Sequence, residues 1–180
     1  MKYLSSQKNR GFTVVELLVS LSIIGILSTI VFTNFSQARK RARIARRVSD
    51  MKQVQVALEY YYTVNKVYPS TGGSANWRSE CSAWGGYTAS NVIPGLVPVY
   101  LASMPTDPLV DKAGSKNCYL YTSDGTNYAF RIDSVTEFTS ADYLSRSELV
   151  DPFRDGVANT VVDGTAPTAW KVYSAGAVGW

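Results

Sequence analysis

The chain has 180 residues, of which 46% are hydrophobic and 18% are charged, so we expect one globular domain with an appendage and exclude a disordered or an all-membrane chain. The net charge of +4 is unevenly spread, because residues 1–52 carry ten Lys and Arg against two acids and residues 53–180 carry eight against twelve. The acidic remainder is not expected to bind nucleic acid, and the absence of histidine excludes Ser-His-Asp and Cys-His catalytic sites, so no enzyme is expected.

A polar leader with Lys2, Lys8 and Arg10 precedes an apolar segment, residues 12–35, whose one charge is Glu16. As a helix this segment would be about 36 Å long, enough to cross a hydrocarbon core of about 30 Å. A secretory signal peptide does not fit, because the apolar segment is too long and no small-residue cleavage site follows it. An ordinary single-pass anchor is an alternative.

The charge of Glu16 is the informative feature of the segment. A carboxylate inside a membrane helix costs about 2–3 kcal/mol on insertion scales and usually marks a functional residue. The alternative is that Glu16, near the end of the segment, simply reaches the headgroups.

The sequence GFTVVE at residues 11–16, between a short basic leader and an apolar helix, resembles the processing site of type IV prepilins and type II secretion pseudopilins. The resemblance implies that a membrane aspartyl peptidase cuts after Gly11 and methylates the new amine of Phe12. It also assigns assembly roles to Glu16, the fifth residue of the mature chain, and to Gly25.

Six basic residues directly follow the apolar segment: Arg39, Lys40, Arg41, Arg43, Arg46 and Arg47. Positive-inside counting would keep this side of the segment in the cytoplasm. The processing motif implies the opposite, an N-terminus in the cytoplasm, and we adopt that orientation. The cluster is interpreted as solvated or bound to lipid headgroups, with pairing between subunits of a filament as the alternative.

A helical pattern continues from residue 36 to about residue 65. Apolar side chains recur there at spacings of three and four and form one stripe: Ile44, Val48, Met51, Val54, Leu58 and Tyr61. The stripe is expected to pack on a sheet, and Pro69 ends the helix. The predicted parts are a leader (1–11), a transmembrane and polymerisation helix (12–35), an amphipathic half (36–65) and a head (66–180).

Within the head, residues 70–91 are rich in Ser, Gly and Ala and are predicted to form a loop. Residues 100–108 resemble the segment that leads into the sheet of pilin heads. Residues 118–121 and 128–132 flank an Asp-Gly turn and predict a β-hairpin.

Residues 170–173 are a candidate closing strand, and residues 134–169 receive no assignment. The expected fold class is α+β, a long N-terminal helix packed on a small antiparallel sheet, as in pilins.

Cys81 and Cys118 are expected to form a disulfide if the head lies outside the cytoplasm, with two unpaired thiols as the alternative. Some secretion pseudopilins hold Ca²⁺ near the C-terminus, which makes Asp151, Asp155 and Asp163 candidate ligands. Their spacing matches no EF-hand, and solvated loop acids are the favoured interpretation. No other cofactor is expected.

These observations predict the subunit of a type IV pilus-like filament for adhesion, twitching motility or DNA uptake. A type II secretion pseudopilin is the alternative, and an unprocessed membrane-anchored binding domain is the alternative of another class. The resemblance implies four kinds of partner: copies of the chain itself, prepilin peptidase, an inner-membrane assembly platform and other pilins. It also implies a single-pass precursor in the cytoplasmic membrane and then an extracellular or periplasmic filament.

Overall fold

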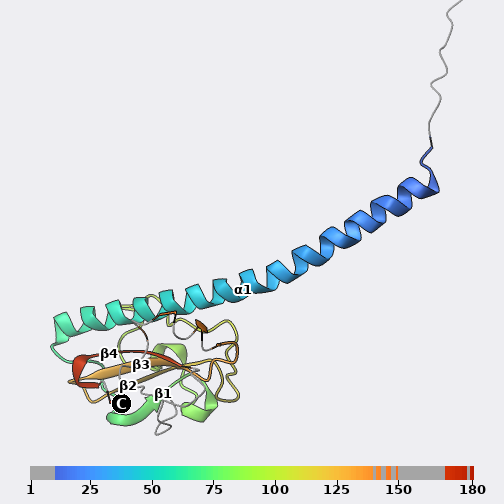
Figure 1. Cartoon of the computed structure of the whole chain (residues 1–180). Coiled ribbons are helices and arrows are strands. Elements are labelled where there is room, and N and C mark those ends of the chain that lie inside the picture. Colours follow the sequence, from blue (N-terminus) through green and yellow to red (C-terminus); the bar gives the residue numbers. More distant parts are fainter. Residues whose placement is uncertain (1–10, 140, 143–144, 147–148, 150–168, 178) are drawn as a thin grey trace, which may run out of the picture. The chain divides into compact units, whose positions relative to one another are not determined.

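The computed structural model describes residues 11–139, 141–142, 145–146, 149, 169–177 and 179–180, and of residues 29–34 it describes the backbone alone. The chain divides into two compact units, residues 1–42 and 43–180. One helix of 52 residues, α1 (Val14–Asn65), belongs in part to each unit (Figure 1). The single long helix expected from the uninterrupted pattern is therefore confirmed.

The end of α1 has a left-handed cap. Lys66 follows the last helical residue with φ of 62°, and its amide donates a hydrogen bond of 2.8 Å to the carbonyl oxygen of Tyr62. This geometry satisfies a carbonyl that would otherwise lack an intrahelical partner. The helix thus ends just before Pro69, as predicted.

Among the described residues, the head holds a four-stranded sheet in the order β1-β2-β3-β4, and every neighbouring pair is antiparallel. Its strands are β1 (Gly73–Arg78), β2 (Cys118–Ser123), β3 (Tyr128–Asp133) and β4 (Trp170–Tyr173). The part of α1 that belongs to the head lies along this sheet (Figure 1). The α+β class and the closing strand at residues 170–173 are confirmed.

β2 and β3 form the predicted hairpin in continuous register, from the pair Cys118–Asp133 to the pair Ser123–Tyr128. In the connecting turn, Asp124 Oδ1 accepts hydrogen bonds from the amides of Thr126 (2.8 Å) and Asn127 (2.7 Å). Such side-chain bonds to the backbone two and three residues on fix a tight turn.

Both faces of the hairpin are buried, and alternate side chains serve two different clusters. One face packs against α1 and contributes Tyr119, Tyr121, Tyr128, Phe130 and Ile132. The opposite face contributes Cys118 and Leu120 to a smaller cluster with Cys81, Trp77, Trp84 and Val110. The sheet is thus covered by α1 on one side. On the other side it is covered by loops that carry Cys81, Trp84 and Val110, which we term the loop layer.

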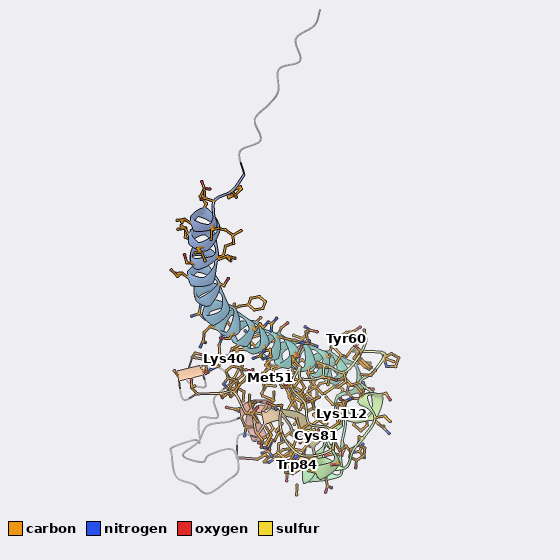
Figure 2. All side chains as sticks on the ribbon, turned by 90° about the vertical axis from the view of Figure 1, so that its right-hand side faces the viewer. Lys40, Met51, Tyr60, Cys81, Trp84 and Lys112 are labelled. Carbon is orange, nitrogen blue, oxygen red and sulfur yellow. A yellow bond between two sulfur atoms is a disulfide. The ribbon has the colours of Figure 1, made fainter. Side chains whose placement is uncertain are left out.

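The predicted stripe on α1 is confirmed. Val48, Met51, Val54 and Leu58 are buried in the main core, and Ile44 and Tyr61 are half-buried against it. Met51 lies on the side of α1 toward the sheet, whereas Tyr60 points away from it (Figure 2).

The loop predicted for residues 70–91 is wrong in part, because β1 lies within it and pairs with β2 as an edge strand. Its side chains have little intrinsic preference for strands, so pairing with the free edge of β2 decides its conformation. The register shifts along β1, which keeps the pairing irregular. Residues 100–108 contain turns and no strand.

Candidate processing and assembly site

The predicted cut lies between Gly11 and Phe12, immediately outside α1. Both residues have non-helical backbone and are exposed, and Phe12 is 83% exposed. A Cβ added to Gly11 would meet no atom within 4 Å. Among the described residues, nothing therefore shields this peptide bond.

Thr13 and Glu16 form a reciprocal cap at the start of α1. The Thr13 amide and hydroxyl each donate to Glu16 Oε2 at 2.9 Å, and the Glu16 amide donates to the Thr13 hydroxyl oxygen at 3.2 Å. This is a capping box, in which a Thr at the N-cap and a Glu three residues later each satisfy a backbone donor of the other. The Thr-Val-Val-Glu spacing carries this signal, and the sequence reasoning above missed it.

The helix beyond the cap presents apolar side chains on all sides. The exposed ones are Val14, Val15, Leu17, Leu18, Val19, Leu21, Ile23, Ile24, Ile26 and Leu27. Within the residues described, no helix is long and apolar enough to cross a membrane. The transmembrane assignment of residues 12–35 stays an expectation.

Small residues interrupt the apolar surface, and three serines among them bond to the helix backbone. The hydroxyls of Ser20, Ser22 and Ser28 donate to backbone carbonyl oxygens three or four residues earlier, at 2.7–2.8 Å. Gly25 has no atom within 4 Å of an added Cβ. Nothing described within the chain therefore requires glycine there, although glycine inside a helix costs about 1 kcal/mol relative to alanine.

A buried ion-pair cluster occupies the start of the head half of α1. The side chain of Arg47 is fully buried and pairs with Asp107 Oδ2 at 2.5 Å and with Glu137. Arg43 pairs with the same Glu137 carboxylate at 2.6 Å. Arg47 is thus bound inside the head, where neither the solvated nor the inter-subunit interpretation holds, and Arg43 is paired within the chain while its side chain stays partly exposed.

The electrostatics of this cluster favour the charged forms. Burial alone would lower the pKa of Arg47, but its hydrogen bonds to Asp107 and Glu137 outweigh this effect. Burial alone would raise the pKa of Glu137, but its hydrogen bonds from Arg43 and Arg47 outweigh that effect as well. The pKa of Arg47 is therefore raised and that of Glu137 is lowered. Such a pair is strongly destabilised when one partner is removed, because a charge stays buried alone.

A neighbouring carboxylate behaves in the opposite way. Asp50 is buried and accepts a hydrogen bond of 2.9 Å from the Tyr119 hydroxyl, and Arg46 lies 3.8 Å away. Burial raises the pKa of Asp50, which the bond from Tyr119 and the charge of Arg46 offset only in part.

A third carboxylate fastens the far end of α1 to the sheet. Glu59 accepts hydrogen bonds from the hydroxyls of Tyr68 (3.1 Å) and Tyr128 (3.1 Å). Burial, together with the charge of Glu59, raises the pKa of Tyr68 to about 12. Burial and the charge of Glu59 likewise raise the pKa of Tyr128, so both phenols remain protonated donors at neutral pH.

The expected disulfide between Cys81 and Cys118 is present, with the two Cα atoms 6.2 Å apart. It ties the loop layer to β2, and Cys81 lies near Trp84 on the side of the head remote from α1 (Figure 2). In the chain-entropy model, closing a loop of this size stabilises a fold by about 3–4 kcal/mol.

The candidate calcium ligands Asp151, Asp155 and Asp163 lie outside the described residues. Among the residues that are described, no group of three or more Cys, Asp or Glu side chains could hold a metal ion.

Comparison with known proteins adds two findings to this geometry. The family model for the prokaryotic N-terminal methylation motif matches residues 6–32. The chain is also 30% identical over 104 residues to the type II secretion system core protein G of Escherichia coli (strain K12), an alignment that covers 58% of this chain and 69% of that protein. The chain belongs to the pilin and pseudopilin family. It is therefore a structural subunit and not an enzyme.

Other members of the family match over shorter stretches. Core protein G of Pectobacterium carotovorum subsp. carotovorum is 36% identical over 67 residues, which cover 37% of this chain and 43% of that protein. The type IV major pilin protein PilA of Myxococcus xanthus (strain DK1622) is 28% identical over 83 residues, which cover 46% and 38%. The chain thus spans less than half the length of these two relatives, and no solved structure matches it.

Proposed function

We propose that this chain is the subunit of a pilus-like filament that serves a type II protein secretion apparatus. The observation that carries the proposal is the alignment with core protein G of Escherichia coli, which covers 69% of that protein. The sequence alone favoured a type IV pilus-like filament over a secretion pseudopilin. The alignment with the pilin PilA covers only 38% of that protein and supports the pilus less strongly.

Maturation in this proposal begins with a cut between Gly11 and Phe12, followed by methylation of the new amine. The methylation-motif match spans both residues, and both lie exposed outside α1. The bond is therefore accessible to a peptidase without unwinding the helix.

Before the cut, residues 12–35 cross the cytoplasmic membrane with the N-terminus in the cytoplasm. After it, the helices leave lipid and bundle into the core of the filament, with the heads outside. Small residues such as Ser22, Gly25 and Ser28 permit the close approach that helix association in an apolar medium requires. A packing role for Gly25 between subunits would account for a glycine that nothing described within the chain requires.

Glu16 supplies the counter-charge for assembly. Cleavage creates a positive amine on Phe12, and an unpaired ion in an apolar core is heavily penalised. Glu16 is the one acidic residue among residues 12–35. A carboxylate has about four acceptor positions, so the bonds from Thr13 leave capacity for the amine of a neighbouring subunit.

Three kinds of partner follow from the family: the prepilin peptidase, an inner-membrane assembly platform and other pilins. The filament would be periplasmic if it drives secretion and extracellular if it is a surface pilus. An unprocessed membrane-anchored domain is the remaining alternative, and it would retain residues 1–11.

A gene-replacement experiment tests the proposal. Cells that lack the native gene receive either the wild-type chain or Gly11→Leu, and intact mass, sheared fibres and secreted protein in the medium are measured. We expect the wild-type chain to start at methylated Phe12 and to restore secretion. The Gly11→Leu chain should keep residues 1–11 and should not restore secretion. Surface fibres on cells that make the wild-type chain, together with normal secretion by cells that lack the gene, would point to the type IV pilus instead. An uncut wild-type chain would contradict both functions.

A further inference from the structure

Three consecutive basic residues on α1, Arg39, Lys40 and Arg41, form what we term the basic collar. Arg39 and Arg41 are exposed and Lys40 is half-buried; Lys40 is labelled in Figure 2. Consecutive helical residues are 100° apart, so the three side chains spread over about 200° of the helix circumference. The Arg39 guanidinium lies 4.1 Å above the exposed ring of Phe35, which directs it toward the apolar segment.

The arginines that follow the collar have acidic partners within the chain. Arg43, Arg46 and Arg47 each pair with an acid of their own chain, at Glu137, Asp50 and Asp107 respectively. The sequence between Glu16 and Asp50 contains no acidic residue. No acid on the same helix lies within two turns of the collar, which places three basic residues beside the apolar segment.

The position of the collar along α1 matches the thickness of a bilayer. From Thr13 to Lys40 the helix rises about 40 Å at 1.5 Å per residue. A bilayer with its headgroup regions is about 40–45 Å thick. If the capped start of α1 lies at the cytoplasmic face, as in the membrane-inserted precursor proposed above, the collar lies at the phosphates of the opposite leaflet.

We propose that the basic collar binds the phosphate groups of anionic phospholipids and so holds the precursor at a fixed depth before assembly. A guanidinium matches a phosphate through two parallel charge-assisted hydrogen bonds, and an ammonium adds a point charge. Basic residues beside a membrane segment are attracted to anionic leaflets. The inference rests on the membrane-inserted precursor of the proposed function and adds the lipid class that it selects.

The test uses the full-length chain reconstituted in mixed bilayers of phosphatidylcholine and phosphatidylglycerol that carry spin-labelled lipids. The measured quantity is the association constant of phosphatidylglycerol relative to phosphatidylcholine, in low and high salt. One variant is R39Q/K40Q/R41Q, and the control K66Q/K112Q/K116Q removes the same charge from three exposed lysines of the head. Resistance to carbonate extraction is measured for each protein.

The wild type and the control should select phosphatidylglycerol. In the collar variant, the association constant of phosphatidylglycerol relative to phosphatidylcholine should fall at least about five-fold, which is the effect of losing one basic residue at an anionic surface. High salt should reduce the wild-type preference. An inserted collar variant with unchanged selectivity would overturn the inference and leave the proposed function intact. Displacement of phosphatidylglycerol by an added DNA duplex would assign the collar to nucleic acid, and a wild-type chain extracted by carbonate would overturn both proposals.

Discussion

At the scale of single residues, the buried arginine of the head contributes more to the stability of the fold than its exposed neighbour does. Arg47 and Arg46 are adjacent on α1, but the first is fully buried against Asp107 and Glu137 whereas the side chain of the second is 57% exposed. Breaking a buried pair leaves a charge without compensation, whereas an exposed pair is worth about 0–1 kcal/mol.

We therefore expect Arg47→Met to lower the free energy of unfolding by about 3–5 kcal/mol. Arg46→Met, the matched control, should lower it by about 1 kcal/mol or less. Urea unfolding of a head fragment that begins at Arg43 measures both. Equal losses from the two variants would show that the buried pair has no special weight, and adding Asp107→Asn to Arg47→Met should recover part of the loss.

The same cluster predicts a dependence on acid. The pKa of Glu137 is lowered in the fold, so its contribution to stability is present above its ordinary value of 4.5 and is lost as the pH falls through the lowered pKa. Asp50, whose pKa is raised by burial, acts in the opposite sense and favours the fold in acid. Between pH 5 and about 3, Glu137→Gln should flatten the loss of melting temperature and Asp50→Asn should steepen it. A loss in Glu137→Gln as steep as in the wild type would contradict the assignment.

At the scale of elements, the head half of α1 has a buried and an exposed side, and the two can be compared directly. Leu58 is fully buried in the main core, whereas Val56, two residues earlier, is 69% exposed. Leu58→Ala should lower the free energy of unfolding by about 2–5 kcal/mol. Val56→Ala, measured in the same denaturant titration, should change it by no more than about 0.5 kcal/mol. A similar cost for both would mean that the stripe does not face the core.

The loop layer depends on a covalent tie. Cys118→Ser should lower the free energy of unfolding by about 2–5 kcal/mol, because the segment from Cys81 onward loses its link to β2. Peptide mapping without reductant should recover Cys81 joined to Cys118 from the wild type. Complete thiol labelling of native wild-type protein would contradict the tie.

The sequence predicted the elements whose signal is periodic and missed contacts between distant residues. The stripe on α1 and the hairpin at residues 118–132 follow from spacing and turn chemistry alone. β1 did not, because its pairing depends on the free edge of β2. The burial of Arg47 against Asp107, 60 residues away, is equally invisible in a linear pattern.

At the scale of the whole molecule, one carboxylate links the local structure of α1 to the proposed polymer. Glu16 closes the capping box with Thr13, and it is also the proposed counter-charge for the amine of Phe12 in a neighbouring subunit. The first role needs only an acceptor, which glutamine also provides, whereas the second needs a negative charge. Glutamine at this position therefore separates the two roles.

We expect Glu16→Ala and Glu16→Gln to be cut after Gly11 and to insert in the membrane, because both remove a costly charge from an apolar helix. Both should assemble few or no fibres, because neither can neutralise an incoming amine. Thr13→Ala, which weakens the cap but keeps the carboxylate, should assemble far better than either. Sheared fibres and membrane-fraction blots from cells that make only one variant measure these outcomes. Normal fibre yield from Glu16→Gln together with failure of Glu16→Ala would assign Glu16 to the cap, and helix packing would then drive polymerisation without the charge pair.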